Sequence, residues 1–256
     1  MMMKGELTRI ADIKKLSMEN AEKDYILDLL LFQTYSGFGD MLILKGGTSL
    51  YKLYSLNRFS EDLDFTLNRR KFDGKTFLKQ LTRSLALVGV EGTVKSIDEF
   101  KNETNIRLGF RGPLYSGKKE SLCFVALNVS QREKVLMDAK KELVVPASKE
   151  IPSFQVFVMD EREIAAEKVR AIMTRNKARD IYDLWFLLKR GTKPEIDMIN
   201  RKLKFYDMKY SSKKFVKAIN EKRKFWNTDL RGLMIGDLQD FEKIRSELLT
   251  ALRGTQ

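Results

Sequence analysis

Hydrophobic and polar positions divide the chain into two regions of different periodicity. In the first region, short apolar runs and alternating patterns are interspersed with helical stripes. Strands are predicted at 41–44, 62–67, 94–97, 105–110 and 122–129, and helices at 18–34, 48–54 and 73–87. This mixture predicts an α+β fold, in which flanking helices cover a mixed sheet.

From Met159 onward the periodicity becomes entirely helical. Helices are predicted at 161–175, 179–189, 195–204, 211–225 and 236–252. Pro146 and Pro152 interrupt the chain between the two regions. We therefore predict an α/β core over residues 1–150 and a helical C-terminal lobe over residues 151–256 that completes a cleft with the core.

The composition is that of a folded protein with one sizeable core or two modest lobes. The chain has 256 residues, of which 43% are hydrophobic and 10% aromatic. No apolar run approaches the roughly 18 residues of a membrane span, and no signal-peptide core follows Met1, so we expect a soluble cytoplasmic protein with no membrane partner.

Missing residue types exclude several kinds of chemistry. The chain has no histidine and a single cysteine, Cys123, which lies between apolar neighbours and is predicted to be a core residue. A Ser-His-Asp triad, a histidine-bound zinc and a thiolate metal cage are all excluded. Chemistry must therefore use carboxylates, lysine, hydroxyls and hard metal ions.

The charge balance is strongly basic. Lys and Arg number 48 against 35 Asp and Glu, a formal net charge of +13. This favours a polyanionic partner such as RNA or DNA, because neutralising phosphates releases counterions. An ordinary surface rich in lysine explains the composition equally well.

A glycine pair lies between a predicted strand and a predicted helix, in the sequence Lys45-Gly46-Gly47-Thr48-Ser49. Glycines let backbone N–H groups approach an anion, and a helix N-terminus with two hydroxyls adds favourable contacts to phosphate. A triphosphate would fit there. Taken alone, the segment is equally an ordinary turn with a helix cap, and that interpretation is the better one.

Two carboxylates follow, Asp62 and Asp64 within Arg58-Phe59-Ser60-Glu61-Asp62-Leu63-Asp64-Phe65. On a strand they would project from the same face, because residues two apart point the same way. Mg²⁺ suits such a pair, since it takes one or two carboxylates and completes its shell with water and phosphates. An isolated pair of this kind would more simply be a charged strand edge.

The two motifs in succession are far more specific than either alone. Together they resemble the signature of the DNA-polymerase-β nucleotidyltransferase superfamily and, more narrowly, the first motifs of the AbiEii/AbiGii toxin family. The resemblance implies a nucleotidyltransferase that uses Mg²⁺ or Mn²⁺ held by Asp62 and Asp64. It also implies an NTP site that includes residues Gly46, Gly47, Thr48, Ser49, Arg58 and Ser60.

Later segments extend the resemblance in order to about residue 188. Glu167-Lys168-Val169 and Arg179-Asp180-Ile181-Tyr182-Asp183 look like family motifs in which a lysine contacts the nucleotide and an aspartate completes the site. The resemblance implies catalytic roles for Lys168 and Asp180, the latter as a base or as an organiser of the site. Taken singly, such acids cap helices or form ion pairs.

One position departs from the superfamily pattern. Many relatives carry a third carboxylate on a later central strand, where Ala126-Leu127-Asn128-Val129 offers an amide. An amide oxygen can ligate a cation but neither neutralises it nor acts as a base. Either the site uses two carboxylates, with Asp180 assisting, or the chain is a weakened catalyst, and the first interpretation is the better one.

The family resemblance implies the toxin of a toxin-antitoxin or phage-defence system, with a cognate antitoxin as partner and RNA, specifically tRNA, as an acceptor. Lys213-Lys214 and Lys222-Arg223-Lys224, beside Phe225-Trp226, offer candidate RNA contacts, although a solvated helix face with a buried aromatic pair fits them better. Two alternatives stay open: a protein or small-molecule acceptor, and a nucleic-acid-binding module without catalysis.

Overall fold

The fold is described from a computed structural model covering residues 2–68, 72–132 and 134–253. Contacts within the chain divide it into two units. The first unit comprises residues 1–55, 59–135 and 139–158, and the second comprises 56–58, 136–138 and 159–256. The main division falls after Val158 rather than after residue 150, because a strand at the end of the first region belongs to the sheet.

Within the described residues, the strands of the first unit form one seven-stranded sheet in the order β3-β4-β5-β2-β1-β7-β6. Its strands are β1 (Leu42–Lys45), β2 (Leu63–Leu67), β3 (Gly92–Phe100), β4 (Glu103–Phe110), β5 (Cys123–Ser130), β6 (Lys140–Val144) and β7 (Phe154–Val158). β2 runs parallel to β5 and β1 parallel to β7, whereas the other neighbours are antiparallel. The predicted mixed sheet is confirmed.

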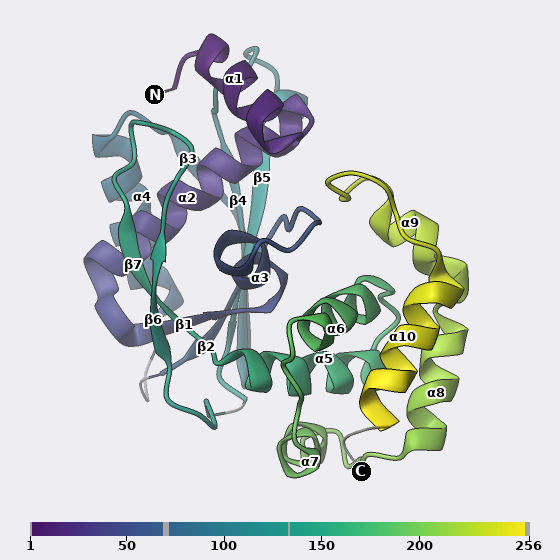
Figure 1. Cartoon of the computed structure of the whole chain (residues 1–256). Helices are drawn as coiled ribbons and strands as arrows, with labels where there is room; N and C mark the ends of the chain where they lie inside the picture. The colour runs from purple at the N-terminus through teal and green to yellow at the C-terminus, as the bar shows by residue number, and fades with distance from the viewer. Residues whose placement is uncertain (1, 69–71, 133, 254–256) are drawn as a thin grey trace. The chain divides into compact units, whose positions relative to one another are not determined.

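The helices of the first unit pack on one another, and some of them cover one face of this sheet. They are α1 (Lys4–Lys14), α2 (Met18–Phe38), α3 (Gly46–Tyr54) and α4 (Gly74–Leu87). α2 contacts β5, β7 and α4, and Figure 1 shows α2 and α4 beside the strands. The strand residues on the covered face are apolar and buried, as Leu63, Phe65 and Leu127 illustrate. Cys123 is buried too, and burial raises the pKa of its thiol to about 12.

An ion cluster fixes α3 to the longer helix α2. The side chain of Lys52 in α3 is 4% exposed, and its Nζ lies 2.6 Å from Asp24 Oδ1 and 2.5 Å from Asp28 Oδ1. Lys14 of α1 also pairs with Asp24, at 2.5 Å. Buried charges are tolerated only when paired and hydrogen-bonded, so these contacts hold the three helices in one arrangement.

The second unit is helical, as predicted. It contains α5 (Glu161–Thr174), α6 (Arg179–Lys189), α7 (Ile196–Lys204), α8 (Ser212–Glu221), α9 (Trp226–Leu230) and α10 (Phe241–Arg253). α5 contacts α6, α7 and α8, and α10 contacts α6. Two short segments from earlier in the chain belong here: the N–H groups of Leu136 and Met137 donate to Glu163, and Asn57 accepts from Ile235.

The structure differs from the prediction in elements that were missed and in shifted boundaries. α1, α9, β6 and β7 were not predicted. β6 and β7 have short, irregular patterns that become strands only through pairing with each other and with β1. The predicted strand at 62–67 begins one residue later, so Asp62 precedes β2, and the helix predicted from 236 begins at Phe241. Among the helices of the described residues, none is long and apolar enough to cross a bilayer.

Candidate active site

The glycine pair opens helix α3 directly at the end of β1. Gly46 has a φ of +74°, a left-handed conformation that side chains other than hydrogen rarely adopt. A Cβ at this position would lie 2.8 Å from Asp64 Oδ2, which is closer than atoms approach without displacement. Glycine is therefore required here, because it allows the start of α3 to lie against the Asp64 carboxylate.

The hydroxyls that follow bind backbone atoms of the site itself. Thr48 Oγ1 donates a hydrogen bond to the carbonyl oxygen of Asp62, and Ser49 Oγ donates to Gly46 O at 2.8 Å. Both side chains are buried. They fix the first turn of α3 and tie it to the residue before β2. Their predicted contacts with phosphate remain predictions, whereas the first N–H groups of the helix have no partner within it and suit an anion.

Asp64 belongs to a row of polar residues across five strands. It is paired in register with Lys45 of β1 on one side and with Asn128 of β5 on the other. Asn128 is in turn opposite Asn105 of β4, which is opposite Asp98 of β3. Directly paired residues project from the same face of a sheet, so the row lies on the face that carries Asp64.

The side-chain amide of Asn128 contacts the carboxylate of Asp64 directly. Its Nδ2 donates a hydrogen bond to Asp64 Oδ1 at 3.0 Å. Both residues are partly exposed, as is Asp62. The glycine turn, Asp62, Asp64 and Asn128 are therefore brought together, all within the first unit.

The donor set fits a hard divalent cation. Across residues 2–68, 72–132 and 134–253, no cluster of three or more His, Cys, Asp or Glu side chains could hold a metal. Mg²⁺ nevertheless binds through one or two carboxylates and draws its other ligands from water and substrate phosphates. Asp64, whose Oδ1 accepts a hydrogen bond from Asn128, offers one such carboxylate, and the predicted contribution of the Asp62 carboxylate remains a prediction.

The predicted residues of the later motifs form a separate cluster within the second unit. Lys168 Nζ lies 2.9 Å from Asp180 Oδ1 and 2.6 Å from Asp183 Oδ2. Arg58 makes a two-pronged contact with Asp183, with Nε and Nη2 each donating at 2.6 Å, and Arg175 Nε donates to Asp180 at 2.8 Å. Three cations thus surround two buried carboxylates.

This cluster sets the protonation of its acids. Burial alone would raise the pKa of Asp180, but Lys168 and Arg175 outweigh it and hold that pKa well below the usual range. The pKa of Asp183 is likewise lowered, because Arg58 and Lys168 outweigh burial. A carboxylate so stabilised in its charged form is a weak proton acceptor. Of the two predicted roles for Asp180, the geometry favours the organiser.

Lys168 and Arg58 are therefore held by acids within the protein. Lys168 is 6% exposed and Arg58 is 1% exposed. Ser60 is also buried, in the first unit. Their predicted contacts with a nucleotide remain predictions.

The basic segment near residue 222 is partly internal. Lys222 is buried, with its Nζ donating to Ile172 O at 2.7 Å, and burial lowers its pKa. Trp226, which follows in the same segment of the chain, is also buried, as expected of an aromatic packing residue. Lys213 and Lys214 are exposed. Lys222 is therefore a structural residue, and its prediction as a candidate RNA contact is wrong.

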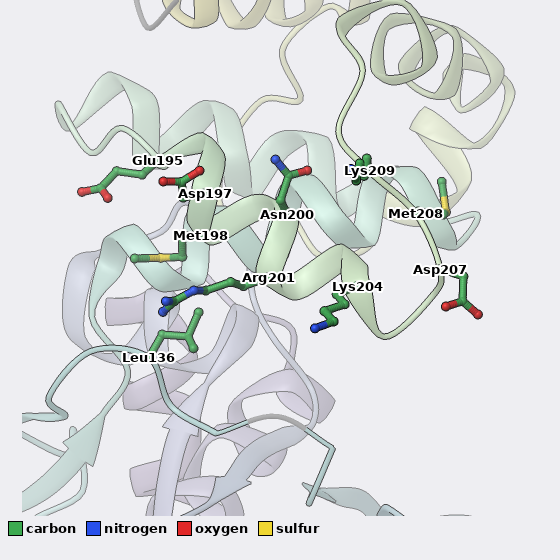
Figure 2. Close-up of a pocket in the computed structure, with 10 residues that line it drawn as sticks. All are labelled: Leu136, Glu195, Asp197, Met198, Asn200, Arg201, Lys204, Asp207, Met208 and Lys209. Atoms are coloured by element: carbon green, nitrogen blue, oxygen red, sulfur yellow. The ribbon is translucent and has the colours of Figure 1, made fainter.

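A cavity of about 780 Å³ lies around α7 in the second unit (Figure 2). Its wall is mixed in charge, with three acids and three cations beside apolar and amide groups. The residues are Leu136, Glu195, Asp197, Met198, Asn200, Arg201, Lys204, Asp207, Met208 and Lys209. It contains none of the residues that the motifs predicted.

The sequence of residues 29–247 matches the family described as nucleotidyl transferase AbiEii toxin of type IV toxin-antitoxin systems. The chain belongs to this family. It is accordingly a nucleotidyltransferase, and the family implies a nucleotide substrate and an antitoxin partner. Nucleotidyltransferases of this superfamily generally use divalent metal ions. A search of the curated proteins returned no match.

Solved structures of similar proteins confirm the fold of this AbiEii-family chain. MenT4, a nucleotidyltransferase toxin from Mycobacterium tuberculosis, superimposes with a TM-score of 0.70 at 18% identity, over 98% of this chain and 88% of that one. JHP933 from Helicobacter pylori gives a TM-score of 0.62 at 21% identity, over 94% and 93% of the two chains. At these identities the likeness concerns the fold.

Two residues of the AbiEii-family chain, Lys45 and Asn105, join the candidate site of the first unit without having been predicted for it, through register with Asp64 and Asn128. Asp183 and Arg175 join the cluster of the second unit through ion pairs. The helical spacing of Asp180 and Asp183 was a usable signal. No local sequence pattern predicts a role for Asn105 or Arg175. Asn105 depends on strand pairing with Asn128, and the Arg175 side chain contacts Asp180, five residues later in the chain.

Proposed function

We propose that this protein transfers a nucleoside monophosphate from an NTP to the hydroxyl of an RNA acceptor, with tRNA as the first candidate, and requires Mg²⁺ or Mn²⁺. In this reaction the acceptor oxygen bonds to the α-phosphorus as the bond to the β-phosphate oxygen breaks. The products are the nucleotidylated acceptor, pyrophosphate and the proton of the hydroxyl. The proposal places the reaction in the cytoplasm, under control of the antitoxin.

One observation carries the proposal: the start of α3 lies so close to Asp64 that a Cβ on Gly46 would be 2.8 Å from Oδ2. Phosphates bound to the first N–H groups of α3 would therefore be beside the carboxylate. Asp62 and Asp64 would hold the cation, which when bound would neutralise charge on the phosphates. Positioning and charge stabilisation supply most of the catalysis in phosphoryl transfer.

Other residues of the first unit prepare this geometry. Thr48 holds the backbone of Asp62, and Asn128 orients Asp64. Lys52, paired with Asp24 and Asp28, fixes α3. Lys168 and Asp180 would contribute to nucleotide binding, and Lys168→Met tests this by its effect on the KM for NTP.

The direct test incubates the protein with each labelled NTP in turn and with total RNA, cell protein or small metabolites. We expect label on RNA in the presence of Mg²⁺ or Mn²⁺, and none after chelation. Asp64→Ala should abolish transfer while the fold stays intact by circular dichroism. Asp98→Ala, at the exposed end of the same polar row, is the matched control and should retain activity.

Two results would overturn parts of the proposal. Label on protein or on a metabolite would replace the RNA acceptor and keep the reaction. Unchanged turnover by the Asp64→Ala variant would remove the mechanism itself, because no cation-loaded carboxylate would then be needed.

A further inference from the structure

The face of the sheet that carries Asp64 continues across β5, β4 and β3. In β5, Cys123, Val125 and Leu127 are buried on the helix-covered face. The alternate residues, of which Phe124 and Ala126 precede Asn128, lie on the other face and are at least partly exposed. Phe124 is 47% exposed, an unusual position for a phenylalanine on a strand.

Local geometry holds the Phe124 ring on this face. Phe124 is paired with Gly109 of β4, and a Cβ on Gly109 would lie 3.1 Å from Phe124 Cε1 and 3.0 Å from Lys95 Cε. Glycine at 109 thus leaves room for both side chains to lie against the β4 backbone. Lys95 Nζ lies 5.8 Å from the centre of the Phe124 ring. An exposed aromatic ring and an ammonium group are therefore adjacent.

A second cation lies between this pair and the candidate site. Arg107 of β4 is exposed and is paired with Ala126, one step along β5 from Phe124. The next step is Asn128, beside Asp64. At about 3.3 Å per residue, Phe124 is about 13 Å from Asn128 along the strand. This corresponds to about four stacked nucleotides at 3.4 Å each.

Asn105 adds an independent observation on the same face. It is paired with Asn128, and its Oδ1 is buried with no hydrogen-bond partner among the described residues. A buried acceptor of this kind carries a free-energy cost that a donor from a bound molecule would remove. A sugar hydroxyl is a donor of the appropriate type.

We propose that the surface formed by Lys95, Arg107 and Phe124 binds the single-stranded end of a nucleic-acid acceptor and leads it to Asp64. A base stacks on Phe124, phosphates contact Lys95 and Arg107, and a sugar hydroxyl donates to Asn105 Oδ1. The inference rests on the proposed transfer to a nucleic acid. Its physical basis is the combination of aromatic rings and cations by which single strands are bound.

The test measures fluorescence anisotropy of a short, labelled single-stranded RNA, and of the DNA of the same sequence, titrated with the full-length protein without NTP. Stacking is worth roughly 1 to 3 kcal/mol per base, so Phe124→Ala should weaken binding by about 5- to 150-fold. Lys95→Gln and Arg107→Gln should each reduce the slope of log K against log salt by about 0.7.

Matched controls come from the same sheet. Phe100→Ala removes an aromatic side chain that is 62% exposed at the far end of β3. Lys141→Gln breaks a cation–aromatic pair with Phe157, 5.4 Å apart, on β6 and β7. Both variants should bind the oligonucleotides as the wild type does. Preference for RNA or for DNA identifies the sugar of the acceptor, and either supports the proposal.

The outcomes separate this inference from the proposed function. If Phe124→Ala binds both oligonucleotides normally, the inference is overturned, while label transferred to RNA by the wild type would leave the function standing. If binding depends on Phe124 but no acceptor is labelled, the surface stands and the function fails. Normal oligonucleotide binding by Phe124→Ala with loss of antitoxin binding would reassign the surface to a protein partner.

Discussion

Asn128 Nδ2 donates a hydrogen bond to Asp64 Oδ1 across the parallel pair of β5 and β2, at 3.0 Å. The amide thus fixes one carboxylate oxygen without adding negative charge. A site with two acids can remain stable before a cation arrives, because no further like charge faces Asp64.

Asn128→Asp should make stability depend on divalent cations. Two carboxylates about 5 Å apart repel by roughly 3 kcal/mol at an effective dielectric near 20. We expect the free energy of unfolding to fall by about 1 to 3 kcal/mol without a cation and to recover largely when Mg²⁺ is added, measured by urea denaturation near pH 7. Asn128→Ala is the control, and its stability should respond to Mg²⁺ no more than that of the wild type. Equal stability of Asn128→Asp and wild type without a cation would contradict the prediction.

Gly46→Ala should disable the site through a single methyl group. The new Cβ would lie 2.8 Å from Asp64 Oδ2 at a φ of +74°. A displacement of about 1 Å in a catalytic group costs about 100-fold in rate, and the left-handed backbone costs about 1 to 2 kcal/mol of stability. Both are measured on one preparation, by NTP turnover and urea denaturation.

Gly37→Ala provides the comparison for Gly46→Ala. Gly37 lies within α2, and a Cβ there would meet nothing within 4 Å. Alanine in a helix should add about 0.5 to 1 kcal/mol of stability and leave turnover unchanged. Full activity in Gly46→Ala would show that the turn does not need to contact Asp64.

Asp180→Asn should make the free energy of unfolding depend less on pH under acidic conditions. The pKa of Asp180 in the folded protein lies below its unfolded value of about 3.9, so the ion cluster contributes stability that is present above about pH 4 and is lost as the pH falls further. We expect the variant to be less stable near pH 6 by about 3 to 5 kcal/mol, since Lys168 loses a buried partner. The difference should shrink near pH 3 in urea titrations. A constant difference at both pH values would contradict this linkage.

Lys52→Met should uncouple α3 from α2. Asp24 and Asp28 would lose their shared buried partner, although Lys14 would remain paired with Asp24. Breaking a buried pair costs about 3 to 5 kcal/mol. Lys217→Met, which breaks an exposed pair with Glu221 at 3.9 Å, should change stability by less than about 0.5 kcal/mol in the same denaturation experiment. Similar losses in the two variants would refute a special role for Lys52.

Local patterns predicted most of the elements that build the site. The strand around Asp64 and the helix after Gly46 follow from periodicity and from glycine in a short segment, and both formed. Strands β6 and β7 were missed because five residues of irregular pattern gain strand structure only from their neighbours. The two acids were found from their spacing, although Asp62 lies just before the strand.

The sequence by itself determined the family, the strand that carries Asp64, the helix that follows Gly46 and the residue types available for chemistry, because each depends on short segments of the chain. Only the tertiary structure decided that Asn128 orients Asp64, that Thr48 holds Asp62 and that Arg58 is paired with Asp183. These contacts join residues between 14 and 125 positions apart. Strand register and helix packing set such pairings, and no local pattern encodes either.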